Sequence, residues 1–541
     1  MPRPFRVVPL ILVSFLSSPV LRADTYPRQA GVDVLHYVFR LTLRDDTDAI
    51  AGEATVQVRA RTAGLLEVSL DLAGETDGKG MKVSSVEAAG KPLAYRHEAN
   101  RLTVTLAEAA TAGQEFAIDV RYGGRPAGGL YVGPNIFGAR TFFSENWPDQ
   151  ARQWLPMVDH PYEKSTGEFL VTAPAHYQVV ANGLLVAERD LTEGRRLTHW
   201  RQSVPIVSWL YALGVARFAV HHAGEVKGVP HQTWVFPEHQ DEVAPAFEST
   251  GRGQLEFLSE RVGPFAYEKL AHVEAASLKG GTEHASAIFY GETSVTGHPI
   301  VGLVAHEVAH QWFGDAVTES DWDDVWLSEG FATYFQKLYT EHAQGRDAFV
   351  AEMKASRETV FVLTGKYPDK PVIHPNLDDM TQVLNGLVYD KAGWTLHMLR
   401  GLVGDDAFWR GIREYYRRFK DRHVRTDDFQ QVMEEASGLA LRPFFDQWLR
   451  RSGVPRIEGS WRYDRAQKQI VVELAQTQPG EPYRLPIDIG IGGLPTARVE
   501  HVLLEQVRAT FRFAATEEPT AVMVDPSTWL LAELPPLRRT R

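Results

Sequence analysis

Hydrophobic and polar residues alternate with a period of two through most of the first 220 residues. The clearest rows are residues 37–43, 102–106 and 116–122, in which every second side chain is apolar or aromatic. A strand with one buried face shows this alternation. Glycine pairs at 123–124 and 128–129 interrupt the rows, as turns do. The pattern predicts an all-β N-terminal domain over residues 24–220.

The spacing changes to that of helices over residues 221–452. Residues 241–262 and 394–452 carry apolar side chains at helical intervals, and alternation returns in residues 485–491 and 507–513. We therefore expect a mostly helical central domain over residues 221–452 and a small C-terminal β-sandwich over residues 453–541. The fold class expected is multidomain α+β. The basic tail, residues 538–541, is expected to be disordered.

Composition narrows the classes of function. A chain of 541 residues is too long for one hydrophobic core. The formal net charge of −12 argues against nucleic acid as a partner. The chain has no cysteine, so disulfides, a cysteine nucleophile and thiolate zinc ligands are all excluded.

Residues 1–23 have the features of a secretory signal peptide. Arg3 and Arg6 supply a positive start, and residues 7–16 form an apolar run too short to cross a bilayer. Small residues precede an expected cut after Ala23, and no later stretch is apolar for long enough to span a membrane. We expect an exported protein, periplasmic or secreted, without a membrane span once the signal is removed. A membrane anchor or a buried strand is the alternative for this segment.

The candidate chemistry lies in the sequence His306-Glu307-Val308-Ala309-His310. Residues four apart lie on one face of a helix, so both imidazoles can point at the same spot. Two neutral imidazoles suit a zinc ion. Glu307 then lies beside the metal without having to bind it, which is where a general base for an attacking water is needed. The alternative is a half-buried helix with two hydrogen-bonded histidines and no metal.

A catalytic zinc ion of this kind usually has a third protein ligand and one open position. Glu329 is the candidate, with eighteen residues between it and His310. Gly314 can end the first helix, and Asp323 or Asp324 can cap the next helix, which would carry Glu329. The sequence therefore predicts one Zn²⁺ per chain, bound by the two histidines and Glu329.

This stretch resembles the aminopeptidase N-type zinc metallopeptidases, which are gluzincins. The resemblance is carried by the HExxH motif, by the interval to Glu329 and by the flanking residues HQWFGD and WLSEGFATYF. It begins near residue 30, continues into the C-terminal region and is densest over residues 280–335. It implies a saddle-shaped N-terminal β domain and a thermolysin-like catalytic domain. The long C-terminal helical domain of larger members is expected to be absent, because the chain stops at residue 541.

The resemblance also implies how a substrate is held. Residues 280–284, Gly-Gly-Thr-Glu-His, are similar to the exopeptidase signature Gly-Ala-Met-Glu-Asn, with its Met and Asn replaced. In that signature the glutamate binds the free α-amine of the substrate, and Glu283 takes this place here. Gly280 and Gly281 are expected to let a peptide backbone approach an edge strand closely.

Two further site residues follow from the resemblance. The segment from Arg152 to Pro161 is similar to the family pattern AR-x-x-x-P-x-x-D-x-P. Relatives carry a Glu or Gln a few residues before this arginine that also holds the amine, but the matching position here is Trp147. Glu145 is the candidate replacement, with an ordinary loop carboxylate as the alternative. Tyr389, in a segment similar to Tyr-x-Lys-Gly, is expected to donate a hydrogen bond to the oxyanion, with a buried core tyrosine as the alternative.

Together these features predict a zinc metallo-aminopeptidase that removes N-terminal residues from peptides with a free N-terminus. The alternatives are a zinc epoxide or lipid hydrolase of the same scaffold, a thermolysin-like endopeptidase and a non-catalytic peptide-binding protein. The Gly-Gly-x-Glu element argues against the endopeptidase, and the complete set of Glu307, Glu329 and Tyr389 argues against the non-catalytic protein. The preferred first residue, the peptide length and the oligomeric state are not predicted by the sequence.

Overall fold

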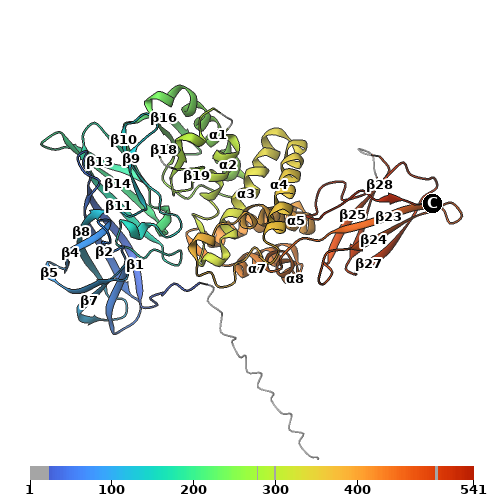
Figure 1. The fold of residues 1–541 in the computed structure, drawn as a ribbon, viewed down its shortest axis with the longest axis horizontal. Coiled ribbons are helices and arrows are strands. Elements are labelled where there is room, and N and C mark those ends of the chain that lie inside the picture. Colours follow the sequence, from blue (N-terminus) through green and yellow to red (C-terminus); the bar gives the residue numbers. More distant parts are fainter. Residues whose placement is uncertain (1–23, 277, 298–299, 494–497, 541) are drawn as a thin grey trace, which may run out of the picture.

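The computed structural model describes residues 24–276, 278–297, 300–493 and 498–540. A β-rich region, a helical region and a second β-rich region follow one another along the long axis of the molecule (Figure 1). The predicted signal peptide, residues 1–23, lies outside the described residues.

Among the described residues, the structure contains no helix that is both long and apolar enough to cross a bilayer.

Strand β1 (Val32–Thr42) shows why alternation predicts strands in the first region. Its side chains Tyr37, Phe39 and Leu41 point into the core and are at most 1% exposed. It pairs with β2 in antiparallel and with β11 in parallel orientation, within a sheet of order β13-β14-β11-β1-β2-β8-β4-β5. The predicted β-rich N-terminal region is confirmed. The remaining strands of this sheet are β2 (Ile50–Ala60), β4 (Gly80–Ala88), β5 (Lys91–Pro92), β8 (Glu115–Arg125), β11 (Ser165–Pro174), β13 (Leu184–Asp190) and β14 (Arg195–Ile206).

Two smaller sheets complete the first region. One has the order β3-β7-β6 and the other the order β12-β15-β10-β9. Strand β10 ends at Ser144, directly before Glu145. The strands are β3 (Leu65–Asp71), β6 (Ala94–Glu98), β7 (Arg101–Ala110), β9 (Leu130–Pro134), β10 (Arg140–Ser144), β12 (Gln178–Ala181) and β15 (Leu213–Ala216).

A five-stranded sheet of order β16-β17-β18-β20-β19 opens the helical region. Its edge strand is β19 (Gly281–Thr282), which leads directly into Glu283. Helix α3 (Trp326–Gln344) is buried along most of its length, since other helices cover it on several sides. The other elements are β16 (Ala219–Val226), β17 (Val229–Val235), β18 (Leu270–Ala275), β20 (Ala287–Gly291), β21 (Val317–Glu319), β22 (Arg422–Val424), α1 (Gln240–Arg261), α2 (Val301–His310), α4 (Arg346–Lys366), α5 (Ala392–Val403), α6 (Asp405–Phe419), α7 (Thr426–Ser437) and α8 (Arg442–Phe445).

The last region contains a sheet of order β27-β24-β23-β29 and a sheet of order β26-β25-β28. The expectation of a disordered tail is wrong for residues 538–540. Arg538 and Arg539 form β29 beside β23, and the Thr540 backbone N–H donates to the Trp461 carbonyl at 2.8 Å. The strands are β23 (Ile457–Asp464), β24 (Gln469–Gln476), β25 (Leu485–Ile491), β26 (Arg498–Leu504), β27 (Arg508–Ala514), β28 (Val522–Val524) and β29 (Arg538–Arg539).

Buried polar contacts hold the first β-rich region against the loop between α2 and α3. Arg28 pairs with the carboxylates of Asp24 at 3.0 Å and Asp321 at 3.1 Å, and these carboxylate side chains are only 2% and 1% exposed. Lys164 Nζ donates to the Asp315 carbonyl at 2.9 Å. Since that loop joins the two helices with the candidate metal ligands, these contacts fix one region relative to the other.

Candidate functional site

Helix α2 brings the two histidines of the HExxH motif together. His306 Nε2 lies 3.1 Å from His310 Nε2. The apolar side chains of this helix, among them Val304 and Val308, pack into the core. It ends at His310, four residues before the predicted stop at Gly314. The pairing of i and i+4 side chains therefore follows from the sequence as expected.

Helix α3 places Glu329 in its first turn, but not by the predicted cap. Asp321 caps the 3-10 turn that precedes α3, where its side chain accepts from the Asp323 backbone N–H at 3.3 Å. Asp323 instead accepts from the backbone of residues 376 and 377, and Asp324 accepts from Thr426 Oγ1 at 2.6 Å. These long-range partners compete for the two carboxylates, and a local capping rule does not include them.

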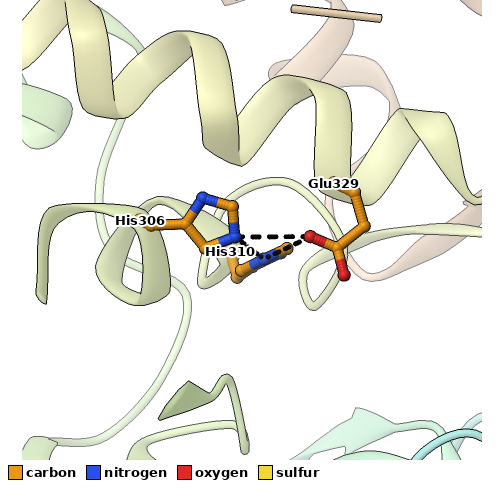
Figure 2. Close-up of side chains that lie close together, drawn as sticks. All are labelled: His306, His310 and Glu329. Atoms are coloured by element: carbon orange, nitrogen blue, oxygen red, sulfur yellow. Dashed lines mark hydrogen bonds and ion pairs between the residues drawn. The ribbon is translucent and has the colours of Figure 1, made fainter. Parts of the chain in front are cut away.

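The three predicted ligand atoms form a nearly equilateral triangle. Glu329 Oε2 lies 3.3 Å from His306 Nε2 and 3.3 Å from His310 Nε2, and the donor atoms face one another (Figure 2). Donor atoms bound to one zinc ion in tetrahedral geometry are about 3.3–3.5 Å apart, given zinc-ligand bonds of about 2.0–2.2 Å. The residues present thus fit a zinc ion with two imidazoles and one carboxylate.

Neighbouring side chains orient these ligands. His310 Nδ1 lies 3.2 Å from the Phe313 carbonyl and 3.0 Å from Ser328 Oγ. A proton on Nδ1 that is donated to the carbonyl leaves Nε2 free to bind a metal. Tyr389 Oη, in the π-helical turn Leu387–Lys391, donates to Glu329 Oε1 at 2.9 Å. The structure therefore brings Tyr389 to the cluster.

The charges of the cluster are strongly coupled. Burial alone raises the pKa of Glu329, but His310 and His306 more than offset it and hold this pKa at about 2. Burial lowers the pKa of His310, whereas the carboxylates of Glu283 and Glu329 raise it well above its usual range. A cation at the triangle would stabilise the same carboxylates that otherwise favour a proton on His310.

Glu307 packs against the edge strand, and its carboxylate also lies within 4.8 Å of the ligand atom of His310. A Cβ at Gly281 would lie 2.5 Å from Glu307 Cδ, so any larger residue here would force this carboxylate to move. Burial raises the pKa of Glu307 well above its usual range. The sequence explains the glycine at position 281 by a substrate peptide that must approach the edge strand. The structure adds a second reason, which is that the Glu307 side chain occupies the space beside this residue. Gly280 has a left-handed backbone with φ of +76° and open space around it.

Glu283 follows the edge strand and points toward the same centre. It is 6% exposed, and within the described part of the chain its Oε1 has no hydrogen-bond partner. One ligand atom each of Glu283, Glu307 and His310 lie within 4.8 Å of one another. A buried carboxylate oxygen without a partner is costly, which indicates a ligand at this position.

Glu145 also reaches the site, from the first β-rich region. Thr282 Oγ1 donates to Glu145 Oε2 at 2.7 Å, and the Trp147 backbone N–H donates to Oε1 at 3.2 Å. Burial raises the pKa of Glu145 to about 7, and the nearby charge of Glu283 adds to the rise. A cavity of about 410 Å³, partly lined by Leu278, adjoins Glu145.

Several residues around the site were missed by sequence reasoning. The rings of Trp209 and Trp322 pack edge-on against that of Trp147, with centroids 5.2 and 4.9 Å from its centroid, and the three rings form an aromatic wall. Gln311 hydrogen-bonds the segment that carries Glu283. No local motif marks Trp209 or Trp322, whereas Gln311 directly follows the HExxH motif and could have been singled out by that position.

Comparison with known proteins matches this architecture. The Peptidase M1 N-terminal domain matches residues 34–210, and the Peptidase family M1 domain matches residues 249–448. Human glutamyl aminopeptidase is 28% identical over 368 residues, which cover 64% of this chain and 37% of that protein. Probable aminopeptidase 1 of Sulfurisphaera tokodaii is 24% identical over 441 residues, which cover 77% of this chain and 54% of that protein. This chain therefore aligns with little more than a third of the human protein.

Solved structures of similar fold include the M1 zinc metallopeptidase of Deinococcus radiodurans. Its TM-score is 0.68 at 27% identity, over 79% of this chain and 95% of that one. A mutant form of it was solved bound to a Tyr-Ser-Ala substrate, with a TM-score of 0.68 and 27% identity. The two domain matches, the shared fold and the ligand triangle lead to one conclusion: this chain belongs to peptidase family M1.

Proposed function

We propose that the protein is a zinc-dependent aminopeptidase that removes single residues from the free N-terminus of peptides. The observation that carries this proposal is the buried, unpartnered Oε1 of Glu283 close to the ligand triangle. A carboxylate at a fixed short distance from the metal can bind an α-ammonium and leaves room for one residue before the scissile bond. The aminopeptidase names of the relatives and the tripeptide bound to the Deinococcus radiodurans enzyme support it.

The proposed metal site consists of His306, His310 and Glu329. A zinc ion held there supplies a Lewis acid that acidifies water and polarises a peptide carbonyl. Glu307, whose carboxylate lies between the edge strand and His310, takes the proton of the attacking water and passes it to the leaving amine. The hydroxyl of Tyr389, already beside the ligand carboxylate, donates to the carbonyl oxygen as negative charge develops.

Glu283 and Glu145 bind the substrate ammonium together in this proposal. The charge of Glu283 raises the pKa of Glu145, and both carboxylates raise the pKa of Glu307. A cation between Glu283 and Glu145 therefore relieves their repulsion. Glu145 replaces the acidic or amide residue that relatives carry at the position of Trp147.

The domain division is also part of the proposal: residues 24–220, 221–452 and 453–541, after a signal peptide of residues 1–23. The two M1 domain matches support the first division. We propose that the two sheets of the last region pack face to face as a β-sandwich. The buried Val472 of β24 and Ile487 of β25 support this packing. The proposal of export, periplasmic or secreted, rests on the basic and apolar pattern of residues 1–23.

Aminoacyl amides with free and acetylated amines test this function. The zinc-loaded protein should cleave the free-amine substrate strongly and the N-acetylated one poorly. Glu283→Gln should raise KM for the free-amine substrate by about 10- to 100-fold, because a charge-assisted hydrogen bond contributes about 1.5–3 kcal/mol. Equal cleavage of both substrates by the wild type would contradict the proposal and indicate an endopeptidase.

A further inference from the structure

Gln311 directly follows the last residue of the metal-binding helix and is fully buried. Its Nε2 donates to the Glu283 carbonyl at 2.8 Å and to Asp315 Oδ2 at 2.7 Å. Its Oε1 accepts from the Ser286 backbone N–H at 2.8 Å. Both N–H groups and the carbonyl of this carboxamide are therefore used, and two of the three strong contacts go to the segment that carries Glu283.

The segment 283–286 is a tight turn between β19 and β20. The Ala287 N–H donates to the His284 carbonyl at 3.1 Å, and Ser286 has a left-handed backbone with φ of +63°. Residues other than glycine seldom adopt that conformation, so the surroundings must hold it in place. Gln311 contacts the first and the last residue of the turn, and it thereby fixes the shape of the turn and its distance from α2.

We infer that Gln311 is a positioning residue that sets the distance between the metal site and the amine-binding carboxylate. This inference rests on the proposed aminopeptidase function and on Glu283 as the amine anchor. Gln311 is adjacent to the ligand His310 in the chain, so it links the backbone of the metal site to the backbone of Glu283 through a single side chain. Asp315 holds the same carboxamide from the other side. Binding of the substrate ammonium requires this distance, because a displaced carboxylate makes a weaker charge-assisted hydrogen bond to it.

The test compares two buried glutamines that are exchanged for methionine of similar length. Gln311→Met removes the contacts to the turn. Gln254→Met is the matched control, because Gln254 is also fully buried and its Nε2 donates to the Ala305 carbonyl on the same α2 helix at 3.1 Å, without contact to the turn. Zinc content, kcat and KM are measured with a free-amine aminoacyl amide and its N-acetylated counterpart.

Gln311→Met should keep one zinc ion per chain and raise KM for the free-amine substrate by about 10- to 100-fold, with a smaller change in kcat. The preference for the free amine should fall by a similar factor, whereas Gln254→Met should leave both within about threefold. If Gln311→Met does not fold, Gln311→Asn, which keeps the amide on a shorter side chain, should shift KM in the same direction.

An unchanged KM in a folded, zinc-loaded Gln311 variant would overturn the inference, as would an equal rise in Gln254→Met. The proposed function fails separately, if the wild type itself does not distinguish the free from the acetylated amine. A wild type that distinguishes them and a Gln311 variant that does so equally well would refute the positioning role alone.

Discussion

Gly281→Ala tests the contact between the edge strand and the proposed base. The added Cβ would lie 2.5 Å from Glu307 Cγ and Cδ and 2.6 Å from Oε1, whereas ordinary contacts begin at 3.4 Å. The carboxylate must therefore move by about 1 Å, and such a misplacement costs about 100-fold in rate. This factor equals about 2.7 kcal/mol of transition-state stabilisation.

The assay is kcat for a free-amine aminoacyl amide, together with zinc content. Gly281→Ala should retain one zinc ion, because the substitution contacts the base and not the ligand triangle. Gly302→Ala is the control on α2, where the nearest atom is the mobile end of Gln336 at 3.1 Å. It should keep kcat and gain up to about 1 kcal/mol of helix stability. A kcat of Gly281→Ala within about threefold of the wild type, or loss of its zinc, would refute the reasoning.

Three further predictions concern the oxyanion, the second anchor and the junction between regions. Tyr389→Phe should lower kcat by about 100- to 1,000-fold with little change in KM, measured in steady-state kinetics. The pKa of Glu145 near 7 means that its carboxyl is ionised above that pH and protonated below it. KM should therefore fall as pH rises through 7, and a pH profile of Glu145→Gln should lack this step. Arg28→Met removes the shorter ion pair of the buried Asp321 and leaves it only Arg425 at 3.9 Å, so it should destabilise the protein by up to about 3–5 kcal/mol in urea unfolding. Arg44→Met is the control, because it removes an exposed ion pair with Asp46 and should lower the free energy of unfolding by less than about 1 kcal/mol.

Periodicity predicted the main regions of the fold because each element follows a simple pattern. In β1 every second residue from Tyr37 to Leu41 is buried, and α2 places its ligands four residues apart. The prediction of a disordered tail was wrong because Arg538 and Arg539 pair with a strand that is distant in sequence. The predicted cap of α3 was wrong for the same reason, since the Asp323 carboxylate accepts a hydrogen bond from the backbone N–H of Asn376 instead.

In the site, too, the residues that follow from local spacing could be predicted, and those that depend on contacts between distant segments could not. The triangle of His306, His310 and Glu329 follows from spacing on two helices. Glu145 could only be a candidate, because its link to Thr282 joins strands from different regions of the chain. The aromatic wall of Trp209 and Trp322 could not be predicted, since its members meet only in the folded structure.

Anomalous diffraction at the zinc edge, from crystals of the zinc-loaded protein, shows which side chains bind the metal ion. Within the described ranges of the chain, two groups of side chains could hold an ion, and they share His310. We expect a single peak about 2.0–2.2 Å from His306 Nε2, His310 Nε2 and the Glu329 carboxylate, with Glu283 left free for the substrate amine. A peak centred on Glu283, Glu307 and His310 would contradict it, because the amine anchor and the base would then both be metal ligands.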